Sequence, residues 1–173
     1  LWSTMPDEEL VRAAGKGRLR QELRSQVERM VADPRSDALV ANFVGQWLQT
    51  RDVESKAVDV EGIYRSRGRG WWRMARLFDW DVREAMRRET ELLFAHVLRE
   101  RLPATDMLLA KQTFLNEPLA RFYGIPEIKG NEMRLVDLPA DSGRGGLLTH
   151  GSLLLVTSNP NRTSPVKRGL FIL

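Results

Sequence analysis

The sequence predicts a mainly α-helical protein, a multi-helix array with at most a minor strand or hairpin near residues 133–138. Apolar residues recur at three- to four-residue spacing over several segments, as they do along one face of a helix. Capping residues and prolines separate these segments. The alternation of apolar and polar residues that is typical of a strand is confined to Met133–Leu138. The 173 residues suffice for one domain, or for two small domains that share a core.

Two helices are expected at the start of the chain. The first should span residues 6–14, because Ser3 or Thr4 can cap it and Pro6 suits a first turn, where its missing N–H costs nothing. The second should span residues 18–32 and end at the Asp-Pro dipeptide that follows. Its apolar stripe consists of Leu19, Leu23, Val27 and Val31.

A third helix should begin after Ser36 or Asp37 and end near Leu48. One face of it carries Leu39, Phe43, Gln46 and Trp47. Residues 51–70 lack periodicity and should form an irregular segment that ends in an exposed loop. Three tryptophans are assigned to the core, namely Trp2, Trp47 and Trp80.

The longest helix is predicted over residues 80–102. Its apolar face consists of Val82, Met86, Thr90, Leu93 and Val97. The pairs Glu84–Arg88 and Arg87–Glu91 stand at helical spacing and should stabilise it by roughly 0.2–0.5 kcal/mol each. A proline closes the helix.

Shorter helices should follow. One is expected over residues 106–111, and another should run from an Asn116 N-cap to Gly124 as a left-handed C-cap. Residues 147–157 should be helical, and a last helix should start at Pro165.

Composition excludes several classes of site. The chain has no cysteine, so it holds no disulfide, thiolate metal site, cysteine nucleophile or c-type haem attachment. Its apolar runs are far shorter than a membrane span. A net charge of +4 and a pI near 9.8 mildly favour anionic partners. Both ends are expected to be cuts from a longer chain, because no targeting segment opens it and an apolar run closes it.

No catalytic motif and no metal site can be assembled from the spacing. His96 and Glu89 stand seven residues apart on nearly one helix face, which is the spacing of half a metal site. A set of His96, His150, Glu89 and Glu91 stays open, but nothing in the spacing requires it. We therefore predict neither catalytic nor metal-binding residues.

The candidate ligand-binding residues gather around the polar stretch Ser158–Gly169. Its hydroxyls, amides and cations could hold a phosphate, a carboxylate or a haem propionate at the start of the last helix. The alternative is a capped loop that only fixes the entry of that helix. The candidates are Arg162, Thr163, Ser164, Lys167, Arg168, His150 and Arg144. Arg144 opens an Arg-Gly-Gly string that suggests the same anion binding, with an ordinary turn as its alternative.

A second candidate is the basic stretch Arg65–Arg76. It interleaves arginines with Trp71 and Trp72, a combination that attracts single-stranded nucleic acids and sugars. The alternative is a solvated surface loop. Nucleic acid is the least favoured of the partners considered.

Several strings together resemble a known group of proteins. The strings are Leu1–Leu10, Asn42–Leu48, Ala85–Glu91, Thr113–Asn116, Tyr123–Ile125, Arg144–Thr149 and Arg162–Gly169. Together they resemble planctomycete-type, cytochrome-c-associated proteins that carry the paired domains of unknown function 1592 and 1588. The resemblance implies that residues 1–103 form a helical domain like 1592, and residues 104–173 a helical domain like 1588 that is truncated at its C-terminus.

The resemblance also implies a setting. Such domains usually follow an exported c-type cytochrome module, so the parent protein would be extracytoplasmic, in the periplasm, and haem c would lie in the parent and not in this segment. The family supplies no catalytic residues to carry over. The 51–76 stretch is longer and more basic than the family pattern leads us to expect.

Three hypotheses follow. The first is a non-catalytic structural or binding region of a larger cytochrome-associated bacterial protein, whose partners are the other domains of its parent chain and an anionic ligand at Arg162–Arg168. The second is part of an enzyme that acts on a polymeric substrate such as a polysaccharide, with a site completed by missing domains. The third is nucleic-acid binding through Arg65–Arg76.

Overall fold

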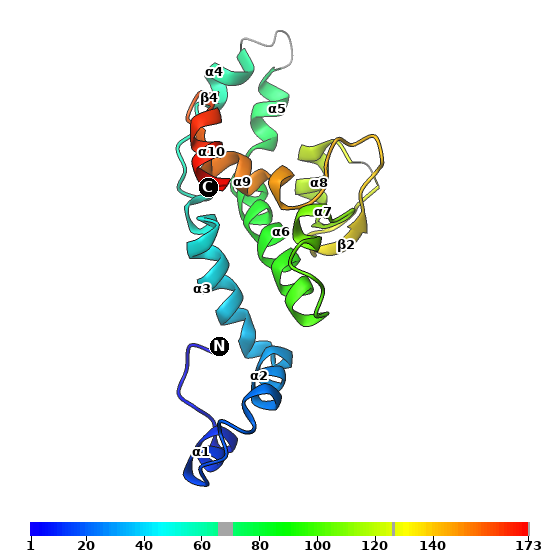
Figure 1. The fold of residues 1–173 in the computed structure, drawn as a ribbon. Coiled ribbons are helices and arrows are strands. Elements are labelled where there is room, and N and C mark those ends of the chain that lie inside the picture. Colours follow the sequence, from blue (N-terminus) through cyan, green and yellow to red (C-terminus); the bar gives the residue numbers. More distant parts are fainter. Residues whose placement is uncertain (66–70, 126, 173) are drawn as a thin grey trace.

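The computed structural model describes residues 1–65, 71–125 and 127–172 and is mainly α-helical, as predicted. Figure 1 shows α3 and α6 running alongside each other, with α1 and α2 at one end and α4, α5 and α10 at the other. The helices are α1 (Glu8–Gly15), α2 (Leu23–Ala32), α3 (Asp37–Trp47), α4 (Val60–Arg65), α5 (Trp71–Leu77), α6 (Trp80–Arg99), α7 (Asp106–Leu109), α8 (Glu117–Tyr123), α9 (Gly151–Val156) and α10 (Pro165–Ile172). Short 3-10 turns lie at Pro34–Ser36, Thr50–Asp52 and Leu147–Thr149.

Two small antiparallel sheets complete the fold. Strand β2 (Arg134–Asp137) confirms the strand predicted near residues 133–138, and it pairs with β1 (Gln112–Leu115), which periodicity had not revealed. Strands β3 (Ser158–Asn159) and β4 (Arg162–Thr163) form a tight hairpin where only a polar loop was expected. Strands β3 and β4 have two residues each, too few for alternation to identify, and β1 hides its pattern because polar Thr113 lies on its buried side.

The N-terminal helices differ from the prediction at their starts. Asp7, not Ser3 or Thr4, caps α1, because its carboxylate accepts the Leu10 N–H at 3.1 Å. Helix α2 starts at Leu23, since the left-handed Gly17 is followed by turns. Helix α4 was not predicted. The Asp59 carboxylate caps its first turn by accepting the Gly62 N–H at 2.8 Å, and apolar periodicity gives no sign of such a cap.

The buried face of α3 is not the one that carries the aromatic residues. Its buried apolar residues are Val40 and Val44, whereas Phe43 and Trp47 are exposed. The assignment of Trp47 and Trp80 to the core is therefore wrong, and that of Trp2 is confirmed. Helix α3 carries two apolar stripes, and packing buries only the one with Val40 and Val44; the Phe43 ring lies 5.5 Å from the Phe94 ring of α6 but stays exposed.

Helix α6 organises the core. The predicted face Val82, Met86, Thr90, Leu93 and Val97 is buried throughout. The first core cluster joins Val82 and Met86 to Leu115, Leu119 and their neighbours. The second joins residues of the C-terminal half of α6 to α3, α7 and α9. Both clusters draw on residues from either side of the predicted boundary near residue 103, and the division into two domains stays a prediction.

The ion pairs on α6 match the prediction in one case of two. Arg87 binds Glu91 at 2.9 Å, as expected. Arg88 also turns to Glu91, at 3.6 Å, instead of pairing with Glu84. Within the residues that the structure describes, no helix has the length and apolarity to cross a bilayer.

The caps predicted for α8 are confirmed. Asn116 accepts the Leu119 N–H at 3.1 Å, and Gly124 takes the left-handed conformation at the end of the helix. This helix ends at Tyr123 and thereby places its side chain against α6 and α9. The end of α8 therefore fixes the position of the Tyr123 hydroxyl.

Candidate functional site

A buried polar network lies where α6, β1, α8 and α9 meet. Glu89 of α6 is only 1% exposed, because it shares the inward face with Met86 and Thr90. Its carboxylate accepts the Thr113 hydroxyl at 2.7 Å and the Tyr123 hydroxyl at 2.7 Å. The Tyr123 oxygen in turn accepts the Gly151 N–H at 2.8 Å. Residues of β1, α8 and α9 are thus tied, directly or through Tyr123, to one carboxyl group of α6.

His150 completes this network from the other side. Its side chain is buried, with 2% exposed, and its Nδ1 lies 2.9 Å from the Thr90 hydroxyl. That hydroxyl also lies 2.6 Å from the Ser152 hydroxyl. His150 Nε2 faces Glu89 Oε1 at 3.9 Å and has no hydrogen-bond partner among the described residues.

Burial controls the charge of these groups. It raises the pKa of Glu89 to about 7, against the opposing hydrogen bonds of Tyr123 and Thr113 and the positive charge of Arg144. Burial also lowers the pKa of His150 to about 3, and Arg144 lowers this pKa further. The pKa of Tyr123 is raised by burial and by Glu89. The contact between His150 and Glu89 is therefore that of a neutral imidazole with a carboxyl, not an ion pair.

A cavity of about 370 Å³ adjoins the network, and Tyr123 and Gly151 form part of its wall. The Arg144 guanidinium lies 3.3 Å from the centre of the Tyr123 ring and donates to the Thr149 carbonyl at 3.0 Å. Much of the remaining wall is apolar and includes Val60, Phe78, Met86, Phe122 and Leu155. The polar part of the wall comes from Arg144 and from the β3–β4 hairpin, including Asn159, Asn161, Arg162 and Thr163.

The structure brings only some of the predicted ligand-binding residues together. Arg144, Arg162 and Thr163 line this cavity, and His150 lies in the network beside it. Ser164 instead accepts the Lys167 N–H at 3.3 Å at the start of α10. Ser164, Lys167 and Arg168 are not among the lining residues, and Lys167 is exposed. The Ser164 contact agrees with the capped-loop alternative, whereas Arg168 Nε is buried and has no hydrogen-bond partner among the described residues. Ligand binding by Ser164, Lys167 and Arg168 stays a prediction.

The four residues weighed as a metal set do not converge. Glu89 and His150 approach each other, but His96 lies against the Phe114 ring and Glu91 binds Arg87. Among the described residues, no group of three or more His, Cys, Asp or Glu side chains could hold a metal ion.

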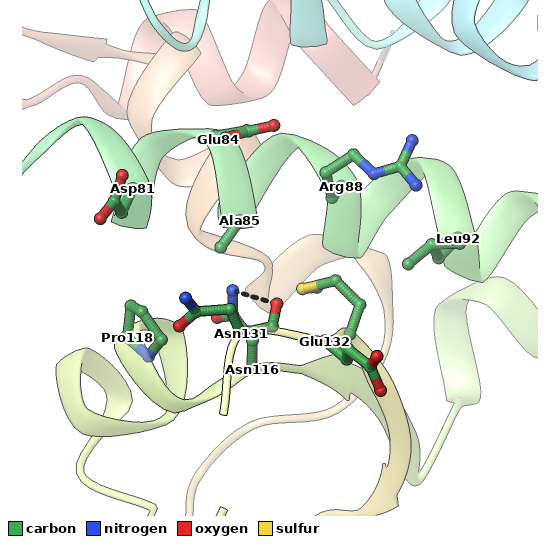
Figure 2. Close-up of a pocket in the computed structure, with 10 residues that line it drawn as sticks. Asp81, Glu84, Ala85, Arg88, Leu92, Asn116, Pro118, Asn131 and Glu132 are labelled. Carbon is green, nitrogen blue, oxygen red and sulfur yellow. Dashed lines mark hydrogen bonds between the residues drawn. The ribbon is translucent and has the colours of Figure 1, made fainter. Parts of the chain in front are cut away.

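A second hollow, of about 480 Å³, lies between α6 and the loop before β2. Figure 2 shows Asn116 and Asn131 facing α6 across this hollow, and the Asn116 amide donates to the Asn131 carbonyl at 3.4 Å. The carboxylates of Glu84 and Glu132 point away from each other (Figure 2). Its charged groups do not aim at one point, so the cavity beside Tyr123 is the stronger candidate.

Comparison with known proteins places the chain in a family. The sequence profile described as PSD4, protein of unknown function (DUF1592), matches residues 1–125. The chain belongs to the DUF1592 family. Searches of curated proteins and of solved structures found no match.

The matched residues of the DUF1592 chain supply Glu89, Thr113 and Tyr123, whereas Arg144 and Arg162 come from residues beyond the match. Sequence reasoning considered Glu89 only as a metal ligand and gave Tyr123 no role. One signal in the sequence could have identified the network: Glu89 stands among the apolar residues of the buried face of α6, and a buried carboxyl requires hydrogen-bond partners.

The basic stretch Arg65–Arg76 lies partly outside the described residues, since 66–70 are not among them. In the described part of the DUF1592 chain, Arg76 lies over the Trp72 ring at 5.3 Å, and Arg65 lies 3.4 Å from Glu61. Binding of nucleic acid by this stretch stays a prediction.

Proposed function

We propose that this DUF1592 chain is a binding region of a larger protein, and that the cavity beside Tyr123 holds an anionic group attached to an apolar or sugar body. One observation supports this most directly. Two arginines from separate segments, Arg144 and Arg162, line one cavity whose walls are otherwise largely apolar. Pockets with apolar walls and a few convergent polar groups are typical of ligand sites. Guanidinium groups pair well with carboxylates and phosphates.

The setting of the parent protein belongs to the same proposal. The resemblance of residues 104–173 to the domain of unknown function 1588 supports a paired arrangement within one parent chain. It also supports an extracytoplasmic parent that carries haem c in a cytochrome module. The other domains of that chain are then the first partners to consider, and an acidic polysaccharide fits the cavity's polar groups.

Binding of model anions tests the proposal. Phenyl phosphate and oligogalacturonate serve as probes, with phenol and a neutral oligoglucoside as uncharged counterparts, and affinity is measured by calorimetry. We expect at least one anionic probe to bind, and Arg162→Gln to weaken that binding by about tenfold or more. Arg144→Gln should act in the same direction. Arg12→Gln removes an exposed arginine of α1 and serves as the matched control.

Equal affinity for the charged and uncharged probes would refute the proposal. So would wild-type affinity in both cavity variants. Circular dichroism shows whether each variant is folded, so that a loss of binding is not mistaken for unfolding.

An enzyme acting on a polymeric substrate is the second candidate. The cavity is open, and its Tyr123 wall connects directly to a buried carboxyl, an arrangement that could be recruited by further domains. Release of reducing ends from oligogalacturonate by the full parent protein, abolished by Glu89→Gln, would favour this candidate. Binding without turnover would favour the first.

A further inference from the structure

Helix α2 packs with its polar side inward. Its one buried residue is Gln26, which donates to Glu9 of α1 at 2.9 Å. Beside it, Arg29 binds Asp7 at 2.7 Å. A surface helix normally buries its apolar stripe and exposes its polar face. The contact with α1 therefore leaves Leu23 and Val27 of the apolar stripe of α2 exposed, while Val31, nearer to α6, is half-buried.

The uncovered stripe forms one wall of a groove of about 660 Å³. Leu23 is 56% exposed and Val27 is 40% exposed, and both belong to the apolar stripe predicted for this helix. Leu98, near the end of α6, contributes apolar surface to the opposite side. Contiguous exposed apolar surface with a polar rim commonly marks an interaction site.

The rim of this groove, which we call the α2–α6 groove, is basic. Its charged residues are Arg20, Arg24, Arg99, Arg101 and Glu28. Glu28 is shared between Arg24 at 3.2 Å and Arg101 at 3.5 Å. Arg99 binds Asp37 at 2.6 Å, on α3 beside the groove. The cations of the rim exceed its single carboxylate, so a partner needs negative charge to complement it.

We propose that the α2–α6 groove docks an acidic amphipathic helix of a partner protein. The stripe of α2 offers contacts along about 15 Å, the length of a ten-residue helix, which matches recognition of a helix through side chains at positions i, i+3, i+4 and i+7. Apolar side chains of the partner fill the groove, while its flanking carboxylates meet the arginines of the rim. This proposal does not depend on the cavity beside Tyr123.

Other occupants fit the groove less well. A membrane surface is broad and cannot follow a concave wall between two helices. A single-stranded nucleic acid binds through stacking on aromatic rings, and the residues that line the groove include none. A second copy of this chain joined symmetrically would place two arginine-rich rims against each other.

The test uses a fluorescein-labelled helical peptide of about 18 residues, with leucine at the four anchor positions and glutamate beside them. Its counterpart carries lysine in place of glutamate. Fluorescence anisotropy should show binding of the acidic peptide, an affinity at least about tenfold lower for the lysine peptide, and weakening of the acidic complex by added salt.

Two groove variants and two controls sharpen the test. The double charge reversal R20E and R24E should abolish binding, and Val27→Ser should weaken it by about tenfold. All three side chains are exposed, so the fold should persist, and circular dichroism checks this. Val166→Ser removes an exposed apolar side chain of α10, and Arg12→Gln removes an exposed arginine of α1; both variants should bind the acidic peptide as the wild type does.

Three results would overturn the proposal. The first is equal binding of the acidic and lysine peptides, or no binding of either. The second is wild-type affinity in the R20E and R24E double variant. The third is a groove-dependent interaction with vesicles of anionic phospholipid, or self-association that these substitutions abolish, in the absence of peptide binding.

Discussion

At the scale of single residues, Glu89 and His150 respond to pH in opposite directions. Burial raises the pKa of Glu89 from 4.5 to about 7, so its contribution to stability is fully present below pH 4.5 and is lost as the pH rises through 7. Burial lowers the pKa of His150 from 6.5 to about 3, so its contribution is present above pH 6.5 and is lost as the pH falls through 3. Between pH 4.5 and pH 6.5, the unfolded-state pKa values of the two residues, a rise in pH removes the contribution of Glu89 to stability and restores that of His150.

The substitution Glu89→Gln isolates the glutamate from this pair. Glutamine keeps the shape of the protonated side chain but cannot ionise. The melting temperature of Glu89→Gln relative to the wild type should therefore rise by several degrees between about pH 5 and about pH 8. Thermal unfolding followed by circular dichroism across this range measures the difference.

Glu84→Gln is the matched control, since this exposed glutamate lies on the same helix. Its melting temperature should follow that of the wild type at every pH. A constant difference between Glu89→Gln and the wild type would show that Glu89 ionises in the folded chain as it does in the unfolded one.

At the scale of secondary-structure elements, the turn after Arg144 depends on a glycine. Gly146 has φ +61°, and a Cβ there would collide with the Leu108 carbonyl at the end of α7. The Gly146 N–H also donates to the Ala110 carbonyl at 2.9 Å. This turn therefore holds the 3-10 turn Leu147–Thr149 and the following α9, and with them His150, against α7.

Gly146→Ala should destabilise the fold by more than about 2 kcal/mol, because conformational strain and a backbone collision add. Gly143→Ala is the control: Gly143 has φ +64° but no atom near its Cβ position, so only the strain of about 1 kcal/mol applies. Urea unfolding of both variants measures the two costs. Equal losses would mean that the chain relaxes around the added methyl group.

At the scale of the whole molecule, α6 belongs to both core clusters. Val82 and Met86 lie in the first, and Ala95 and Val97 lie in the second. A helix shared in this way couples the two clusters, since neither can lose its packing without exposing part of the other. The described part of the chain should therefore unfold as one cooperative unit.

Leu119→Ala in the first cluster and Val44→Ala in the second should both lower the same unfolding transition. Leu119 and Val44 are fully buried, so the larger truncation should cost about 2–5 kcal/mol and the smaller one less. Near-ultraviolet and far-ultraviolet circular dichroism should report coincident curves. Two transitions, each sensitive to one substitution, would instead support the domain division near residue 103.

The sequence by itself determined the helical class and the elements whose signals are local. The α8 caps at Asn116 and Gly124, the buried face of α6 and the start of α10 at Pro165 all follow from side chains within one or two helical turns. For the candidate site, the sequence identified Arg144, Arg162 and Thr163 among the candidate ligand-binding residues, but it also included Lys167, which does not line the cavity.

Tertiary structure decided which apolar stripe is covered and which distant polar groups meet. Val44 is buried and Trp47 is exposed because α6 packs on one stripe of α3, a choice that periodicity within α3 does not contain. Glu89 meets Tyr123 and Gly151 only because α8 and α9 both pack on α6. Local spacing sets the conformation of a segment, but its neighbours are set by packing of the whole chain, and the candidate site is made of such neighbours.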